Sequence, residues 1–128
     1  MDAVVIGRGS QHLTLLSSED RPGFLVATLI DAGLKAERAI EAGYVGFSGL
    51  GTFFRELEGA WQGWDGEKAY ESLDRDLQLR ARHRGHVMLG VCLQEAGVGG
   101  WGARSTISVE PGEELSLIAA EVVRLVRP

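Results

Sequence analysis

The sequence predicts an α+β fold: an antiparallel β-sheet of about six to seven strands, with one helix between two strand groups and a second helix at the C-terminal end. Three observations predict it. Short apolar runs bounded by turn residues fill residues 4–30, strict apolar–polar alternation returns over residues 77–109, and apolar stripes at spacings of three and four cover residues 50–64 and 115–126. A chain of 128 residues with 45% hydrophobic and 24% charged content fits a single domain, residues 1–128.

The first part of the chain is predicted to be strands joined by tight turns. Residues 4–6 and 13–16 are apolar runs separated by glycines, which indicates a hairpin. A Pro22-Gly23 turn opens the run at residues 24–30, whose apolar character on both faces predicts a central, covered strand. Residues 34–43 combine high helix propensity with strand alternation, and the tight link before them favours a strand.

The first helix is predicted from an apolar stripe that should pack onto the sheet. Ser48 is the expected N-cap, and Gly63 and Gly66 mark the exit. The stripe is expected to be core throughout and consists of Leu50, Phe53, Phe54, Leu57, Trp61 and Trp64.

The second half is predicted to be a three-stranded meander followed by a helix. Residues 77–82 and 87–93 alternate around an Arg84-Gly85 turn, and a glycine-rich loop at residues 97–100 leads to a strand at 103–109. Pro111 is expected in the first turn of the closing helix, where Glu113 and Glu114 suit the positive end of the helix dipole.

The composition indicates which cellular compartment and which classes of binding partner to expect. A single cysteine, Cys92, cannot form an intramolecular disulfide. The N-terminus has no signal-peptide pattern, and no apolar run approaches the roughly 18 residues that span a bilayer, so we expect a cytoplasmic protein without membrane contact. The net charge of −5 argues against a general nucleic-acid binder.

Charge is unevenly distributed along the chain. Residues 55–76 hold seven acids against three bases, and Arg80, Arg82 and Arg84 follow without an acid among them. Two interpretations are open. The segments form two solvated faces of opposite charge, or the acidic segment is a surface offered to a basic partner, where complementary charge speeds association.

Motifs that would carry chemistry are incomplete. Residues 4–9 resemble the opening of a dinucleotide-binding fingerprint, but His12 replaces its third glycine and a strand follows. His83 and His86 flank a predicted turn and point to opposite faces, so we expect no metal site. Cys92 has no base beside it in the pattern. We therefore predict no catalytic residues, no metal and no cofactor.

The order and spacing of residues 53–93 resemble a known family. The run reads Phe-Phe-x-x-Leu-x-x-x-Trp-x-Gly-Trp-x-Gly, then Ser72-Leu73-Asp74, then a Gly85-His86-Val87 turn and alternating Leu89, Val91 and Leu93. It is similar to an actinobacterial family of unknown function, DUF6228, and more distantly to the WapI-type immunity proteins. Asp74 stands where that pattern usually has Glu, and Arg82-His83-Arg84 where an acidic turn is common.

The resemblance implies a non-enzymatic, immunity- or antitoxin-like module that binds and neutralises a cognate toxin, often a nuclease. The residues expected to contact such a basic partner are Glu56, Glu58, Glu67 and Glu71. The alternative is a small-ligand-binding protein, or a compact cyclase or isomerase, with a pocket formed by Trp64, Trp101, Arg82 and His86. A homodimer with a structural role is a third possibility.

Overall fold

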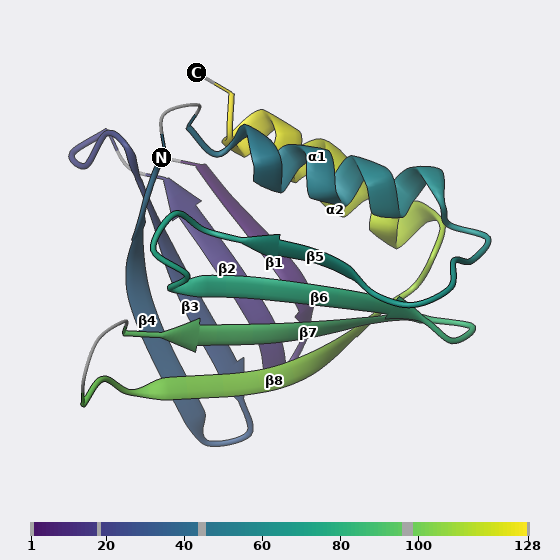
Figure 1. Ribbon diagram of the computed structural model, residues 1–128, viewed down its shortest axis with the longest axis horizontal. Coiled ribbons are helices and arrows are strands. Elements are labelled where there is room, and N and C mark those ends of the chain that lie inside the picture. Colours follow the sequence, from purple (N-terminus) through teal and green to yellow (C-terminus); the bar gives the residue numbers. More distant parts are fainter. Residues whose placement is uncertain (1, 18, 44–45, 96–98, 128) are drawn as a thin grey trace.

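The computed structural model describes residues 2–17, 19–43, 46–95 and 99–127, and it confirms the α+β class. The strands form two four-stranded antiparallel sheets, β1-β2-β3-β4 and β5-β6-β7-β8, each in chain order, where we had expected about six to seven strands in one sheet. Both helices lie together along one side of the two sheets (Figure 1). The elements are β1 Asp2–Arg8, β2 Gln11–Ser17, β3 Phe24–Asp31, β4 Leu34–Glu41, α1 Ser48–Gly59, β5 Lys68–Glu71, β6 Leu77–His83, β7 Val87–Gln94, β8 Gly102–Val109 and α2 Glu113–Leu125.

The inner faces of the two sheets share the core. Alternate residues of every strand from β1 to β4 and from β6 to β8 are buried, as period-two patterning requires. α2 lies against β1 and α1 against β5, so the helix pair covers the side between these two edge strands (Figure 1). Buried side chains of both sheets and both helices therefore belong to one cluster.

The predicted hairpins and the ambiguous strand are confirmed. β1 pairs with β2 around residues 9 and 10, and residues 34–41 form β4, paired with β3. β3 lies inside its sheet as expected, but its outward side chains are half-buried where we had expected a covered second face. The loop expected at residues 97–100 falls partly outside the described residues.

The first helix is shorter than its apolar stripe predicts. It ends at Gly59, and Trp61 is 50% exposed, so the expectation that Trp61 is core is wrong. Gly59 and Gly63 have low helix propensity, and Gly63 adopts a φ of +142°, which a right-handed helix does not permit. Phe47, not Ser48, occupies the N-cap position, and no side-chain capping bond forms there.

The helices pack closely at Gly51, which is buried in α1. A Cβ at this position would lie 3.2 Å from Val126 Cγ2 and 3.6 Å from Val123 Cγ2, so the missing side chain lets the helices approach. α2 begins at Glu113 with Gly112 as its N-cap, so Pro111 precedes the helix instead of forming its first turn. Glu113 and Glu114 lie in that first turn as predicted. Within the described residues, neither helix is long and apolar enough to cross a membrane.

β5 was not expected. We had placed the acidic residues 55–76 on and just after one helix, whereas residues 68–71 form a short edge strand paired with β6. Its inward Tyr70 packs near Phe53 of α1, with ring centroids 6.3 Å apart. The apolar residues of this segment, Ala69 and Tyr70, are adjacent, so it shows no alternation that would predict a strand.

Candidate functional site

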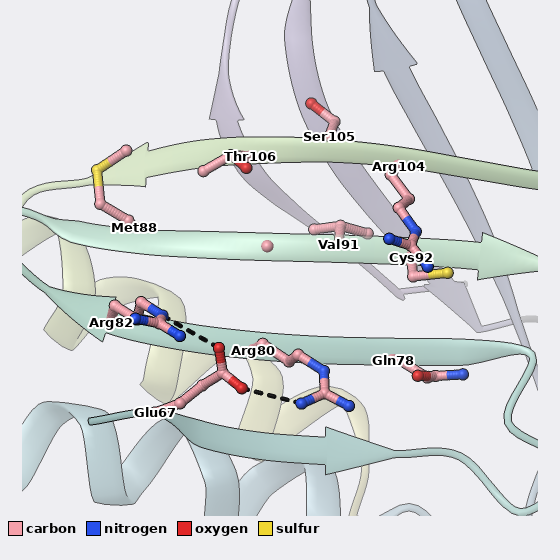
Figure 2. A pocket seen from close by; sticks show the side chains of 11 residues that line it. Glu67, Gln78, Arg80, Arg82, Met88, Val91, Cys92, Arg104, Ser105 and Thr106 are labelled. Carbon is pink, nitrogen blue, oxygen red and sulfur yellow. Dashed lines mark hydrogen bonds and ion pairs between the residues drawn. The ribbon is translucent and has the colours of Figure 1, made fainter.

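A hollow lies on the outer face of the β5–β8 sheet (Figure 2). Its volume is about 640 Å³. The hollow forms because Gly90, in the interior strand β7, lies in register between Arg80 of β6 and Thr106 of β8 and has no side chain to fill the space. Its lining residues are Glu67, Gln78, Arg80, Arg82, Met88, Gly90, Val91, Cys92, Arg104, Ser105 and Thr106.

One carboxylate bridges two arginines at the β5 side of this hollow. Arg80 Nη1 donates to Glu67 Oε1 at 2.9 Å, and Arg82 Nε donates to Glu67 Oε2 at 3.1 Å (Figure 2). Alternating residues of one strand point the same way, so the sequence spacing of Arg80 and Arg82 places both on this face. The hydrogen bond from Arg80, then that from Arg82, lowers the pKa of Glu67 below its ordinary value.

A third arginine reaches the hollow from the opposite side. Arg104 of β8 is in register with Cys92 of β7, and Figure 2 shows its side chain extending over Cys92 toward β6. No ion pair of Arg104 is found within the part of the chain that is described. The hollow therefore has three guanidinium groups and one carboxylate, a local excess of positive charge in a protein of net charge −5.

The four acids predicted to contact a partner lie on two neighbouring elements. Glu56 and Glu58 belong to α1, Glu71 is the last residue of β5, and Glu67 immediately precedes β5. Glu58 accepts a hydrogen bond from Arg55 at 2.7 Å, which lowers the pKa of its carboxyl group.

The four acids differ in how strongly other side chains hold them. Glu67 is held by two arginines and Glu58 by one. Glu71 lies 3.5 Å from Arg75, and both side chains are largely exposed. No ion pair of Glu56 is present among the described residues. Glu56 and Glu71 are thus the two most available for a partner.

The four residues of the alternative pocket do not converge. Arg82 lines the hollow, but Trp64, Trp101 and His86 do not. Trp64 Nε1 donates to the carbonyl oxygen of Ala81 at 3.3 Å. His86 Nδ1 lies 2.8 Å from a carboxylate oxygen of Glu110. Trp101 is partly exposed next to the start of β8.

The glycine motif near the N-terminus and His83 have structural roles. Residues 4–9 form β1 and its hairpin turn, and the strand β2 follows, as expected from the incomplete dinucleotide fingerprint. His83 is half-buried, and its Nε2 lies 2.9 Å from the carbonyl oxygen of Trp61. In the described ranges no three His, Cys, Asp or Glu side chains gather as a metal site would require.

Sequence reasoning missed the convergence of Arg104 with Arg80 and Arg82. Period-two alternation along β6 and β8 puts all three on outward positions, but it does not give the register between β7 and β8. The signal available was Gly90, a glycine inside an alternating strand, because such a residue often marks a close approach or an open site.

Comparison with known proteins gives a family and no described function. Residues 6–128 match the profile of a family of unknown function, DUF6228. No curated protein matches the chain. No solved structure matches it either.

Proposed function

The chain belongs to the DUF6228 family, and because that family has no known function, we propose one from the chain's own surface: a non-enzymatic, immunity- or antitoxin-like module that binds and neutralises a basic partner protein, such as a nuclease toxin. The more distant resemblance to WapI-type immunity proteins supports the same role. The proposed compartment is the cytoplasm, in keeping with one cysteine in 128 residues.

One observation carries the proposal: exposed carboxylates lie along α1 and β5, two adjacent elements packed against each other. Tyr70 of β5 packs near Phe53 of α1, so both elements are anchored in the core. We call the exposed acids of this region the acidic border: Glu56, Asp65, Glu71 and Asp74.

The acidic border suits recognition by electrostatic steering. Rigid elements hold the charges in fixed positions, and complementary charge raises the rate at which a basic partner is captured. A nuclease has a basic substrate groove, which is the surface that an inhibitor must cover. Glu58 and Glu67, being engaged by arginines of the same chain, contribute less to this field than Glu56 and Glu71.

A second candidate function, binding of a small ligand, is favoured by the hollow at Arg82. It does not use Trp64, Trp101 and His86 together, because these side chains do not meet around that hollow. Nothing in the hollow's geometry favours cyclase or isomerase chemistry over simple binding.

The test uses the product of the neighbouring gene as the candidate toxin, since an immunity gene normally lies beside its toxin gene. Association rates are measured at low and high salt for the wild type and for the double variant Glu56→Lys, Glu71→Lys. We expect the variant to associate about tenfold more slowly at low salt, with the difference shrinking at high salt as the charges are screened.

The matched control is Glu19→Lys, Glu41→Lys, which changes the net charge equally at exposed positions of the β1–β4 half. It should associate faster than the border variant. If the two double variants slow association equally, net charge and not the acidic border governs capture. If the neighbouring product does not bind the wild type, the immunity role with that toxin is wrong.

A further inference from the structure

We propose that the hollow on the outer face of the β5–β8 sheet, named here the arginine hollow, binds a compact organic anion: a carboxylate or phosphate group on a small, partly apolar body. Three guanidinium groups, those of Arg80, Arg82 and Arg104, border the hollow from two sides. The shared chemistry is a bidentate oxyanion, for which the planar guanidinium fork is the best-matched side chain in proteins.

Donor counting shows that the arginines have capacity for a ligand. A guanidinium has five N–H donors. Arg80 and Arg82 each give one hydrogen bond to Glu67, and no ion pair of Arg104 occurs among the described residues. Most of the N–H groups around the hollow therefore face solvent and are available to an oxyanion without breaking an existing contact.

Glu67 acts here as a positioning residue. One carboxylate oxygen accepts a hydrogen bond from Arg80 at 2.9 Å, and the other accepts one from Arg82 at 3.1 Å. Both long side chains are therefore restrained before a ligand binds. Ordering a flexible side chain costs about 0.5–1.5 kcal/mol on binding, and restraint in advance removes part of that cost. A single carboxylate shared by two arginines leaves the site positively charged.

The shape of the hollow sets the size of the ligand. Its volume of about 640 Å³ lies within the range of roughly 300–1,000 Å³ that small-molecule sites occupy. Gly90 leaves the floor without a side chain, and Met88 and Cys92, which share the outward face of β7, supply apolar atoms beside the arginines. The ligand therefore places its charged group against the guanidiniums and its apolar part over β7.

A compact anion fits better than a polyanion. Nucleic-acid binding draws its affinity from many phosphate contacts along a basic surface. This chain has a net charge of −5, and Glu71 of the acidic border lies on the edge strand β5 of the same sheet. A long anionic chain leaving the hollow on that side would be repelled, whereas a small anion stays within reach of the three arginines.

The arginine hollow and the acidic border are built from different side chains, although Glu71 of the border is close enough to Arg80 to interact with it electrostatically. The hollow depends on Arg82, Gly90 and Arg104, and the proposed partner surface depends on Glu56 and Glu71, so either can fail without the other.

The first experiment measures binding to the purified full chain by titration calorimetry and thermal shift, at constant ionic strength set with sodium chloride. One arm uses inorganic phosphate and adenosine monophosphate, and the other uses citrate and benzoate. We expect saturable binding in at least one arm with a Kd below about 1 mM. Binding confined to one arm supports the site and identifies the oxyanion as phosphate or carboxylate. If no probe differs from sodium chloride, the proposal is wrong.

Variants locate the binding. Arg82→Gln and Arg104→Gln each remove a charge without changing the strands, and each should weaken binding at least about tenfold. Gly90→Val fills the floor and should abolish binding. Gly90 does not have a positive φ, and a Cβ there would lie 3.4 Å from the carbonyl oxygen of Arg80, so the backbone accepts a Cβ at this position. Gly90→Ala is the milder variant if valine disturbs folding, which circular dichroism checks.

Arg84→Gln is the matched control, because Arg84 is an exposed arginine of the adjacent turn that does not line the hollow. It should bind the anion like the wild type. Equal weakening in Arg84→Gln and Arg82→Gln would mean that only the overall charge matters, and this would overturn the site.

Cys92 provides an independent readout of position. It is the single cysteine of the chain, half-buried, and it lines the hollow. Alkylation by iodoacetamide, a neutral reagent that does not compete for the arginines, should slow severalfold when the tightest-binding probe saturates the protein. An unchanged alkylation rate at saturation would place the anion elsewhere and contradict the proposal.

Discussion

The two sheets share a strand order and differ on their outer faces. β1–β4 and β5–β8 are both antiparallel meanders, and both turn alternate apolar side chains toward the same core. On the outer face of the first sheet, the interior strands β2 and β3 bear no Asp, Glu, Lys or Arg over residues 12–16 and 24–30. On the outer face of the second sheet, the interior strands β6 and β7 bear Arg80, Arg82 and the bare Gly90.

This difference shows that folding constrains the inward positions of both sheets much more than the outward positions. Inward positions must be apolar and must fit their neighbours, because buried groups without partners are costly. Outward positions face water and accept charge at little cost to stability. The second sheet has a charged hollow on its outer face, whereas the outward side chains of the first sheet's interior strands are uncharged over the residues compared.

The largest effect should appear where the two sheets are alike. Leu15 of β2 and Leu89 of β7 are both almost fully buried in the shared cluster. Replacing either with alanine should lower the free energy of unfolding by about 2–5 kcal/mol, because each leaves a cavity that its surroundings only partly fill. Chemical denaturation measures the free energy of unfolding of each variant.

Leu117→Ala is the control for that pair, since Leu117 lies 61% exposed on α2, and it should change stability by less than about 0.5 kcal/mol. A large loss for one sheet and none for the other would contradict a single shared core.

A smaller loss of stability is expected from breaking an ion pair that joins the two sheets. Arg38 of β4 donates through Nε to Asp76 at 3.1 Å, and the Asp76 side chain, next to the start of β6, is only 7% exposed. Asp76→Asn should lower stability by about 1–3 kcal/mol, because the half-buried guanidinium loses the nearer of its two carboxylate partners and keeps only Glu95, at 3.7 Å. Denaturant titration measures the loss.

The matched control, Asp74→Asn, makes the same chemical change at an exposed position two residues away and should cost less than about 0.5 kcal/mol. Equal costs for the two variants would show that the Arg38–Asp76 bridge does not hold the sheets together.

The smallest effect concerns the outer face of the second sheet. The hydrogen bond from Arg80, then that from Arg82, lowers the pKa of Glu67 from its ordinary value of 4.5. A depressed folded-state pKa means that the contribution of Glu67 to stability is present above its unfolded value and is lost as the pH falls through the folded value. NMR titration of the Glu67 carboxyl group should give a folded pKa below 4.5 in the wild type.

In Arg80→Gln the pKa of Glu67 should rise toward 4.5, and in Arg84→Gln it should stay at the wild-type value. A Glu67 that titrates identically in the wild type and in Arg80→Gln would contradict its role in holding the arginines.

Local patterns predicted most of the elements, and their errors have identifiable causes. Alternation found β6, β7 and β8, and the stripe over residues 115–126 found α2. The stripe of α1 was extended too far because Trp61 and Trp64 continue its spacing, although glycines end the helix before them. β5 was missed because its pairing with β6 and its packing against α1 stabilise it, and a four-residue segment shows neither in its sequence.

The sequence by itself determined which residues face inward, where most turns lie and which segments are charged, because these properties depend on neighbours a few positions away. Only the tertiary structure decided that the strands divide into two sheets, that Glu67 holds Arg80 and Arg82, and that Arg104 reaches the same hollow over Cys92. The reason is physical: the register and facing of strands far apart in the chain depend on how all the apolar faces are buried together, and no local pattern contains that information.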